Sequence, residues 1–350
     1  MKELRRIAYL EGHSDRVWYV TEHPDLPLFA SCSADKTVRL WSSRSFKLIA
    51  TLEGDQKRSI RSAAWKPSRG EKGPLLASAS FDGSVGIWDE GDEGSWDCLA
   101  MLDGHENEAK GVAWSSNGTL LASCSRDKSV WVWEAGDDYN DFECLAVLQE
   151  HSQDVKCVAW HPSEELLASG SYDDCIRLWR EDQDDWACCC LLESQHGTVW
   201  SIAFDPASAQ DGTSRFASAT DDGSVCIWRR LQQGNSTTTS NTASMPSTLK
   251  STTLEEHWLL ESILPSVHIG PVYCVAWSKK TGHIASAGSD GNVAVYTEGT
   301  KQWRILACKQ DIHSVYEVNS VCFLNNSDDD LKELLVTGAD DGKVAVSICN

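Results

Sequence analysis

The stretch SCSRDKSVWVW, residues 123–133, belongs to a motif that recurs along the chain. In seven places an Asp stands four residues after a Ser or Thr, and in five of them a Trp stands six residues after the Asp. A His opens six of the units, usually 22 residues before the Asp. The unit is therefore about 45 residues long and occurs seven times, which is typical of a repeat protein.

Each unit contains short segments of alternating apolar and polar residues, separated by turn residues. Examples are VKCVAW (155–160), LLASGS (166–171) and CIRLW (175–179). Such segments predict β-strands. Four short strands in a unit of this length predict one blade of a β-propeller, so we expect an all-β fold with seven blades.

The four recurring residue types resemble the WD-repeat family over essentially the whole chain. In that family the His, Ser or Thr, Asp and Trp of one blade form a buried hydrogen-bonded tetrad. The chemistry agrees, because a buried Trp needs a hydrogen-bond acceptor for its single N–H group. A hydroxyl can accept from it, and an imidazole and a carboxylate can continue the hydrogen-bonded chain. The predicted tetrads are His13, Ser31, Asp35 and Trp41; His105, Ser123, Asp127 and Trp133; His151, Ser169, Asp173 and Trp179; and His196, Ser218, Asp222 and Trp228. Three units depart from the pattern, with Gln56 in place of the His, and Tyr296 and Ser347 in place of the Trp.

The two ends of the chain predict how the ring closes. LRRIAYLEGH (4–13) matches the outer strand and His of another unit, CLAMLDGH (98–105), whereas the last unit stops after its third strand at KVAVSICN (343–350). We expect the N-terminal strand to complete the seventh blade and remove an open sheet edge. Residues 1–350 would then form a single seven-bladed domain.

One segment, residues 231–253, does not follow the repeat. LQQGNSTTTSNTASMPSTLKSTT is rich in Ser and Thr and nearly free of apolar periodicity, and the outer strand of blade five resumes after it at HWLLESIL. We interpret the segment as a disordered surface insertion, with a regulatory phosphorylation site as the alternative.

The composition limits the partners. The chain has 31 cationic and 52 acidic residues and a formal net charge of −21, so its field repels nucleic-acid backbones and anionic membranes. The N-terminus lacks the charged-then-apolar pattern of a signal peptide, and no run of 18 apolar residues follows. We therefore expect a soluble intracellular protein that binds neither nucleic acid nor membrane, with its 14 cysteines as free thiols.

Catalytic and metal-binding interpretations are weaker than structural ones. A Ser, a His and an Asp in every unit could indicate a hydrolase, but a catalytic site is single, whereas this set recurs in equivalent places. Paired Cys-x-x-Cys spacing is absent, although three cysteines stand together at 188–190. Several cysteines share repeat positions, as small buried apolar residues do: Cys98, Cys144 and Cys188; Cys32 and Cys124; Cys157 and Cys274. We expect no enzyme activity, no metal and no cofactor, with Cys189 as the least certain thiol.

The candidate site lies on one face of the ring. In propellers of the WD-repeat family, the loop before the first strand and the turn after the second lie on the same face around the channel. The residue before each tetrad Asp, and the residue just inside each first strand, should point there. These positions bring together cations and aromatic side chains: Arg61, Lys110, Arg126 and Lys156, with Trp18, Phe81, Tyr172 and Trp200.

Such a cluster suits an extended peptide that carries carboxylates and an aromatic side chain. Arg126 is the central candidate because a guanidinium grips a carboxylate with two parallel hydrogen bonds. The alternative is that Arg126 only pairs with a neighbouring carboxylate, such as Asp173 or Glu108.

Longer stretches carry a closer resemblance. The segments GHENEAKGVAW (104–114), CSRDKSVWVWE (124–134), EHSQDVKCVAWHPSEELLAS (150–169), SYDDCIRLW (171–179), HGTVWSIAFDP (196–206) and HSVYEVNSVCF (313–323) resemble the family of WD-repeat subunits of the cytosolic iron-sulfur cluster assembly targeting complex. Members of this family are non-enzymatic adaptors that bring apo-proteins to the machinery for 4Fe-4S cluster insertion.

The resemblance implies specific partners. They are a small acidic α/β subunit, a HEAT-repeat subunit, a hydrogenase-like iron-sulfur carrier and apo iron-sulfur clients, including clients whose C-terminal tails end in an acidic and an aromatic residue. The important arginine of the family's propeller face matches Arg126, and the implied location is the cytoplasm, extending to the nucleus. The alternative function is a substrate receptor of a ubiquitin ligase, or a general WD-repeat signalling scaffold, that uses the same face.

Overall fold

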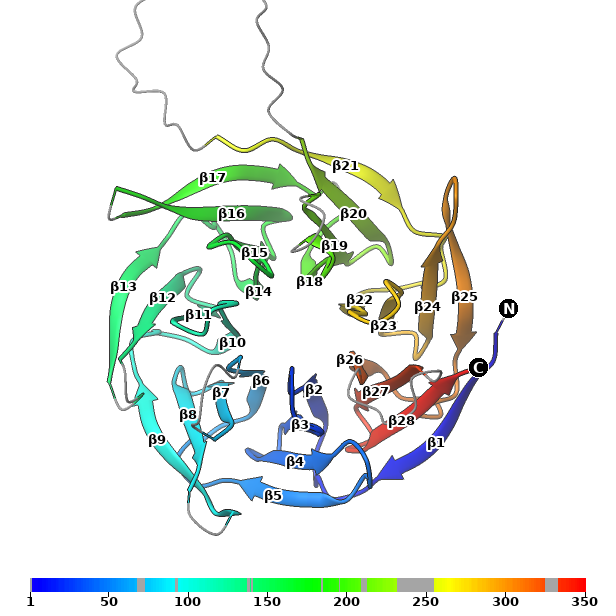
Figure 1. Cartoon of the computed structure of the whole chain (residues 1–350), viewed down its shortest axis with the longest axis horizontal. Coiled ribbons are helices and arrows are strands. Elements are labelled where there is room, and N and C mark those ends of the chain that lie inside the picture. Colours follow the sequence, from blue (N-terminus) through cyan, green and yellow to red (C-terminus); the bar gives the residue numbers. More distant parts are fainter. Residues whose placement is uncertain are drawn as a thin grey trace, which may run out of the picture.

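The structure is a computed structural model that describes residues 2–67, 73–91, 94–136, 139, 141–183, 185–194, 196–208, 213–231, 255–324 and 333–350. In these ranges, 28 strands form seven four-stranded antiparallel sheets that stand radially around a central axis (Figure 1). The predicted all-β seven-bladed propeller is confirmed. The predicted disordered insertion, residues 231–253, lies outside the described residues except for Leu231.

Six blades are built from four consecutive strands, numbered here from the axis outward. Blade one contains β2 (Val17–Glu22), β3 (Leu28–Ser33), β4 (Val38–Ser42) and β5 (Leu48–Leu52). Blade two contains β6 (Ile60–Trp65), β7 (Leu75–Ser80), β8 (Val85–Glu90) and β9 (Trp96–Leu102), and blade three contains β10 (Ala109–Trp114), β11 (Leu120–Ser125), β12 (Val130–Ala135) and β13 (Phe142–Leu148).

The later blades repeat this order. Blade four contains β14 (Val155–Trp160), β15 (Leu167–Ser171), β16 (Cys175–Asp182) and β17 (Asp185–Glu193). Blade five contains β18 (Val199–Phe204), β19 (Arg215–Thr220), β20 (Val225–Arg230) and β21 (Trp258–Ile263), and blade six contains β22 (Val272–Trp277), β23 (Ile284–Gly288), β24 (Val293–Glu298) and β25 (Trp303–Lys309).

Blade seven joins the two ends of the chain. It contains β26 (Val318–Leu324), β27 (Glu333–Ala339) and β28 (Val344–Cys349), and its outer strand is β1 (Leu4–Leu10). β1 pairs antiparallel with β28 from Leu4 opposite Cys349 to Leu10 opposite Val344, and the two strands lie side by side in Figure 1. The predicted closure by the N-terminal strand is confirmed.

The apolar core lies between neighbouring blades. One buried cluster, for example, contains Val130 and Val132 of blade three together with Leu167 and Trp179 of blade four. A blade has two apolar faces and buries each against a neighbour, so the ring must close for every face to be covered.

The predicted tetrads are complete in blades one, three and four. In blade four, His151 Nδ1 donates to the Asp173 carboxylate at 2.9 Å, and the Ser169 hydroxyl lies 2.8 Å from His151 Nε2. Trp179 Nε1 donates to the same hydroxyl at 2.8 Å. The distances in blades one and three match these within 0.2 Å. The three Ser side chains are fully buried, so their hydroxyls link side chains within the core.

The tetrad predicted for blade five is wrong in one link. His196 bonds Asp222 at 2.7 Å and Trp228 bonds Ser218 at 2.9 Å, but no hydrogen bond joins His196 to Ser218 among the described residues. His196 stands 26 residues before Asp222, rather than 22, and its side chain is 22% exposed, compared with 1% for His151. The extra residues lie between β18 and β19, whereas His196 itself stands only three residues before β18, compared with four between His151 and β14. This shorter approach to the first strand accompanies the more exposed position of His196.

The three altered units find other partners. In blade two the Ser78 hydroxyl donates to Gln56 Oε1 at 2.7 Å, and in blade six the Ser286 hydroxyl lies 3.4 Å from the Tyr296 hydroxyl. In blade seven the Ser347 hydroxyl is buried and has no hydrogen-bond partner among the residues that the structure describes. There Tyr9 of β1 donates its hydroxyl to Asp341, so the closing strand supplies an aromatic side chain to a blade that lacks the Trp.

The tetrad carboxylates predict that the fold weakens in acid. Burial alone would raise the pKa of Asp127 and of Asp173, but hydrogen bonds, first from His105 and His151, outweigh burial and lower each pKa to about 2. An unfolded Asp has a pKa of about 3.9, so a lower pKa in the folded protein means that the ionised carboxylate stabilises the fold. This stabilisation is fully present above pH 3.9 and is lost as the pH falls toward 2. We expect each of the two carboxylates to contribute about 1 kcal/mol that disappears between pH 5 and pH 2.

Urea unfolding between pH 7 and pH 2.5 measures this loss. Asp127→Asn, which cannot titrate, should be less stable at pH 7 and should lose less of its stability on acidification than the wild-type chain. A urea midpoint that stays constant from pH 5 to pH 3 would contradict the assignment.

Candidate partner-binding face

A ring of seven side chains surrounds the channel mouth, one from each innermost strand. Every innermost strand has a register shift across its second residue, where the pairing skips from the first residue to the third. A β-bulge of this kind re-aims the side chain that it carries. The bulged residues are Trp18, Arg61, Lys110, Lys156, Trp200, Tyr273 and Asn319.

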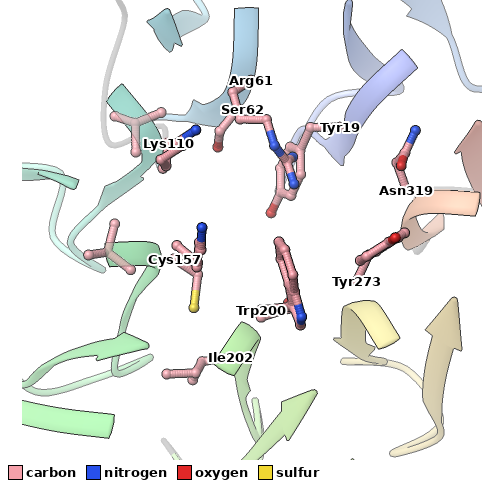
Figure 2. A pocket seen from close by; sticks show the side chains of 14 residues that line it. Tyr19, Arg61, Ser62, Lys110, Cys157, Trp200, Ile202, Tyr273 and Asn319 are labelled. Atoms are coloured by element: carbon pink, nitrogen blue, oxygen red, sulfur yellow. The ribbon is translucent and has the colours of Figure 1, made fainter. Parts of the chain in front are cut away.

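Six of these residues line a pocket at the axis, to which all seven blades contribute. Figure 2 shows Arg61 and Lys110 entering the pocket from one side, and Trp200 and Tyr273 from the opposite side. The bulge falls at the same residue of the repeat in each blade, so the seven side chains form one ring.

The predicted cations lie on the predicted aromatic rings. Lys110 Nζ is 4.3 Å from the centre of the Phe81 ring, and Arg61 lies 5.3 Å from the Trp18 ring. Lys156 Nζ lies between two rings, at 5.0 Å from Tyr172 and 5.2 Å from Trp200. These contacts orient the cations without neutralising them, because a ring offers a quadrupole and no formal charge.

Arg126 lies apart from the pocket, on the rim of the same face. Its guanidinium is 3.4 Å from both carboxylate oxygens of Glu108, and the side chain is 56% exposed. Of the two carboxylates considered as partners, Glu108 is the one in contact, whereas Asp173 bonds His151. Arg58 lies on the other side of Glu108 at 3.7 Å, a cation not predicted from the sequence because it stands three residues before the strand position that carries Arg61.

The opposite half of the face is acidic. Trp200 Nε1 donates to Asp221 at 3.1 Å, Asn319 donates to Asp340 at 2.8 Å, and the Tyr273 hydroxyl donates to Glu317 at 3.0 Å. Burial and the Glu317 carboxylate raise the pKa of Tyr273 to about 12. The face is therefore divided, with cations over blades two to four and carboxylates over blades five to seven.

Burial and the crowding of like charges affect the pKa values of the cations. Burial, and then the charges of Lys156 and Arg61, lower the pKa of Lys110 to about 8. Burial also lowers the pKa of Arg61. Glu108 and Asp154 are the carboxylates that offset this effect at Lys110, and they do so only in part.

The cysteines only partly follow the prediction of buried core thiols. All 14 are free, and Cys32, Cys124, Cys189 and Cys274 are buried. The prediction is wrong for the outer-strand position, where Cys144 is exposed and Cys98 and Cys188 are half-buried, because the blades diverge at the rim of the ring. Among the described residues, no group of three or more His, Cys, Asp or Glu side chains is placed to hold a metal ion.

The family model described as "WD domain, G-beta repeat" matches residues 4–42, 46–89, 96–134, 142–180, 187–229 and 262–297. The matches cover more than half of the chain, and each ends close to the end of the third strand of a blade. The three strands of blade seven that follow β25 are unmatched, in keeping with Ser347 at the tetrad Trp position. No helix in the described ranges is long and apolar enough to cross a membrane.

Several fungal proteins match nearly the whole chain. A protein of Aspergillus niger named "probable cytosolic iron-sulfur protein assembly protein 1" is 42% identical in an alignment that covers 95% of this chain and 92% of that protein. A Debaryomyces hansenii protein of the same name is 40% identical, over 98% of this chain and 99% of that protein. A Schizosaccharomyces pombe protein named as a probable cytosolic Fe-S cluster assembly factor is 42% identical over 99% of this chain, which matches 54% of that protein. The chain thus belongs to the WD-repeat family of cytosolic iron-sulfur protein assembly protein 1.

Proposed function

We propose that the protein is a non-enzymatic adaptor of the cytosolic iron-sulfur protein assembly machinery, which brings apo-protein clients to the carrier of a 4Fe-4S cluster. The names of its relatives support a role in that machinery, and the propeller fold suggests a scaffold. The proposed partners are a small acidic α/β subunit, a HEAT-repeat subunit, a hydrogenase-like carrier and the clients themselves. The proposed location is the cytosol, and in addition the nucleus.

The divided face is the observation that supports this role. Half of it presents cations and aromatic rings, in a chain whose net charge is −21. Long-range repulsion of polyanions combined with a local cationic patch selects a short acidic segment of a protein. We assign partner contact to Arg126, with Arg61, Lys110, Lys156, Tyr172, Trp200, Trp18 and Phe81 around it.

Arg126→Glu should remove clients from the complex and leave the fold intact. The exposed Arg126–Glu108 pair contributes only about 0 to 1 kcal/mol to stability, so the melting temperature should barely change. Reversing a charge that becomes buried against a partner carboxylate costs on the order of 2 to 5 kcal/mol of binding free energy. Affinity purification of the tagged protein from its own cells, with quantification of iron-sulfur clients and assembly proteins, measures the loss.

Arg304→Glu is the matched control, because it makes the same charge change at an exposed position on the outer strand of blade six. If the Arg126→Glu variant retains its clients, Arg126 is not a partner-binding residue. A wild-type preparation that contains cullin adaptors and no iron-sulfur assembly protein would favour the ubiquitin-ligase alternative over the adaptor proposed here.

A further inference from the structure

The outer edge of blade one is the least protected sheet edge of the ring. β5 is the outermost strand of its sheet, so the N–H and C=O groups along its outer side pair with no other strand in the described part of the chain. Natural proteins commonly place a charged residue on such an edge, which opposes pairing with another chain. β5 reads LIATL and contains none. The other six outer strands all contain charged residues: Arg5 and Arg6 on β1, Asp97 on β9, Glu143 on β13, Asp185 and Glu193 on β17, Glu261 on β21, and Arg304 and Lys309 on β25.

Two exposed aliphatic side chains lie on this edge. Leu48 is 44% exposed and Ile49 is 48% exposed. Ile49 is the extra residue of a bulge, because Trp41 pairs with Leu48 and Leu40 pairs with Ala50. Every outer strand has a register shift at this level, so the bulge does not distinguish β5 from the others. The missing charge does, and the two aliphatic side chains offer an apolar contact to an added strand.

The rim around β5 differs in charge from most of the ring. Residues 36–52, which contain β4 and β5, include four cations and no carboxylate, and the outer strands of blade seven, residues 342–349 and 4–10, include three cations and no carboxylate. The two blades are neighbours in the ring (Figure 1). The equivalent segments of blades two to four are residues 83–102, 128–148 and 174–192, which together contain 15 carboxylates and three cations. An acidic partner is therefore attracted to the rim at blades seven and one, and repelled from the rim at blades two to four.

One cation on this rim has no partner within the chain. Arg39 and Arg177 occupy the same repeat position, four residues after the tetrad Asp. Arg177 donates to Glu150 at 2.7 Å, and Glu150 stands directly before the tetrad His of blade four. In blade one the equivalent residue is Gly12, and the Arg39 guanidinium packs against it.

Arg39 is half-buried, its Nε is buried, and it forms no hydrogen bond or ion pair with any residue that the structure describes. Blade four thus supplies from its own chain a carboxylate that blade one lacks. A half-buried guanidinium without a counter-ion favours a carboxylate from another molecule, because it has lost hydration that no internal group replaces.

The net charge of −21 limits what that molecule is. Nucleic acid is repelled by the field of the whole chain, and so is a second copy of the chain, which carries the same charge. A short acidic segment on a protein of low net charge meets the basic rim without this cost. An extended segment fits best, because the free groups on β5 are the backbone groups of a strand.

We propose that β5 is a strand-pairing site, at which a short acidic segment of another protein adds a fifth strand to the sheet of blade one. Its apolar side chains pack on Leu48 and Ile49. Its carboxylates reach Arg39 over Thr51, the small residue of β5 that lies opposite Arg39. The backbones of β4 and the added strand lie about 10 Å apart, a gap that an Arg and a Glu side chain span together. This surface is on the outer rim, away from Arg126, so the proposal goes beyond the adaptor role and does not depend on it.

Binding of a defined acidic strand to the full chain tests the site. The probe is fluorescein-labelled Glu-Val-Glu-Ile-Glu-Val-Glu amide, compared with the same peptide in which Gln replaces every Glu. In fluorescence anisotropy at low salt, the acidic peptide should bind about tenfold more tightly than the Gln peptide, and added salt should reduce the difference. In amide hydrogen exchange, the acidic peptide should protect residues 48–52 and leave β13 unchanged, because it pairs with the free N–H groups of β5.

Variants locate the effect. Ile49→Glu puts a carboxylate on the edge and should weaken binding of the acidic peptide at least tenfold. Leu145→Glu is the matched control, because Leu145 is the extra residue of the same bulge on β13 and is 44% exposed. It makes the same change in net charge and should leave the affinity within about twofold. Both variants should melt at the same temperature, since both side chains are exposed. Arg39→Gln should weaken the acidic peptide about tenfold and leave the Gln peptide unchanged.

Four results would overturn the proposal. Equal affinity for the two peptides would remove the charge recognition, and protection confined to other strands would remove β5 as the site. Displacement of the peptide by a DNA duplex at the same concentration would make the rim a general polyanion site. A wild-type chain that sediments as a dimer, with an Ile49→Glu chain that sediments as a monomer, would make a second copy of this chain the occupant instead.

Discussion

A chain that lacks residues 1–10 is expected to lose its cooperative unfolding transition. β1 contributes six residue pairs to blade seven, and Leu4, 1% exposed, belongs to the core between blades six and seven. Emptying one such Leu site costs about 2 to 5 kcal/mol, and here the backbone hydrogen bonds of β28 are lost as well. The total exceeds half of the stability of a typical domain, which is about 5 to 15 kcal/mol.

The loss extends beyond blade seven. Tyr9 donates to Asp341 and its ring lies 5.7 Å from His313, so removing β1 also disrupts the tetrad of that blade. β28 would become an unpaired edge, a surface prone to aggregation. Thermal melting followed by near-ultraviolet circular dichroism measures the effect. Deletion of residues 1–3, which precede β1, is the control and should melt within a few degrees of the full chain.

If the chain without residues 1–10 still melts sharply at the wild-type temperature, the prediction is wrong. Six complete blades and the three remaining strands of blade seven would then fold stably without β1. Adding a synthetic peptide of residues 1–11 offers a further check. The peptide should restore the transition if strand pairing with β28 is what closes the ring.

Trp179→Ala is expected to cost about 3 to 5 kcal/mol of unfolding free energy, the range for removal of a large buried aromatic side chain. Trp179 is 1% exposed, packs between blades three and four, and lies edge-on to His151 with ring centres 6.3 Å apart. Its loss also deprives the buried Ser169 hydroxyl of a donor. Urea unfolding at pH 7 measures the change.

Trp179→Tyr is the matched comparison, because blade six uses Tyr296 at the same position. A phenol keeps most of the packing volume and can reach the Ser hydroxyl, so the loss should be about 1 to 2 kcal/mol. Equal losses for Ala and Tyr would mean that the indole N–H, rather than the packing, carries the stabilisation.

The repeat pattern made the ring of side chains at the channel mouth partly predictable. The residue just inside each first strand occupies the same place in every unit, so an alignment of the units places Arg61, Lys110 and Lys156 side by side without any coordinates. The bulge that aims these side chains at the axis could not be predicted from the sequence, because a register shift depends on the pairing between two strands.

Contacts between side chains that lie far apart in the sequence were beyond prediction. Glu108 could be named as a partner of Arg126, but so could Asp173, and only the folded geometry chose between them. Arg58 on the far side of Glu108 comes from another blade and falls in no shared repeat position. The missing link between His196 and Ser218 likewise depends on the path of the chain just before β18, which the spacing between His and Asp does not describe.

The amino-acid sequence by itself determined the number of blades, the strand that closes the ring, and which residues repeat at the channel mouth. These properties follow from local alternation and from the similarity of the units, both of which can be read along the chain. The tertiary structure alone decided that Lys110 forms no ion pair among the described residues, that Arg126 stays on the rim, and that Tyr9 serves a blade without a Trp. Such properties depend on distances between side chains far apart in the sequence, and those distances exist only in the folded ring.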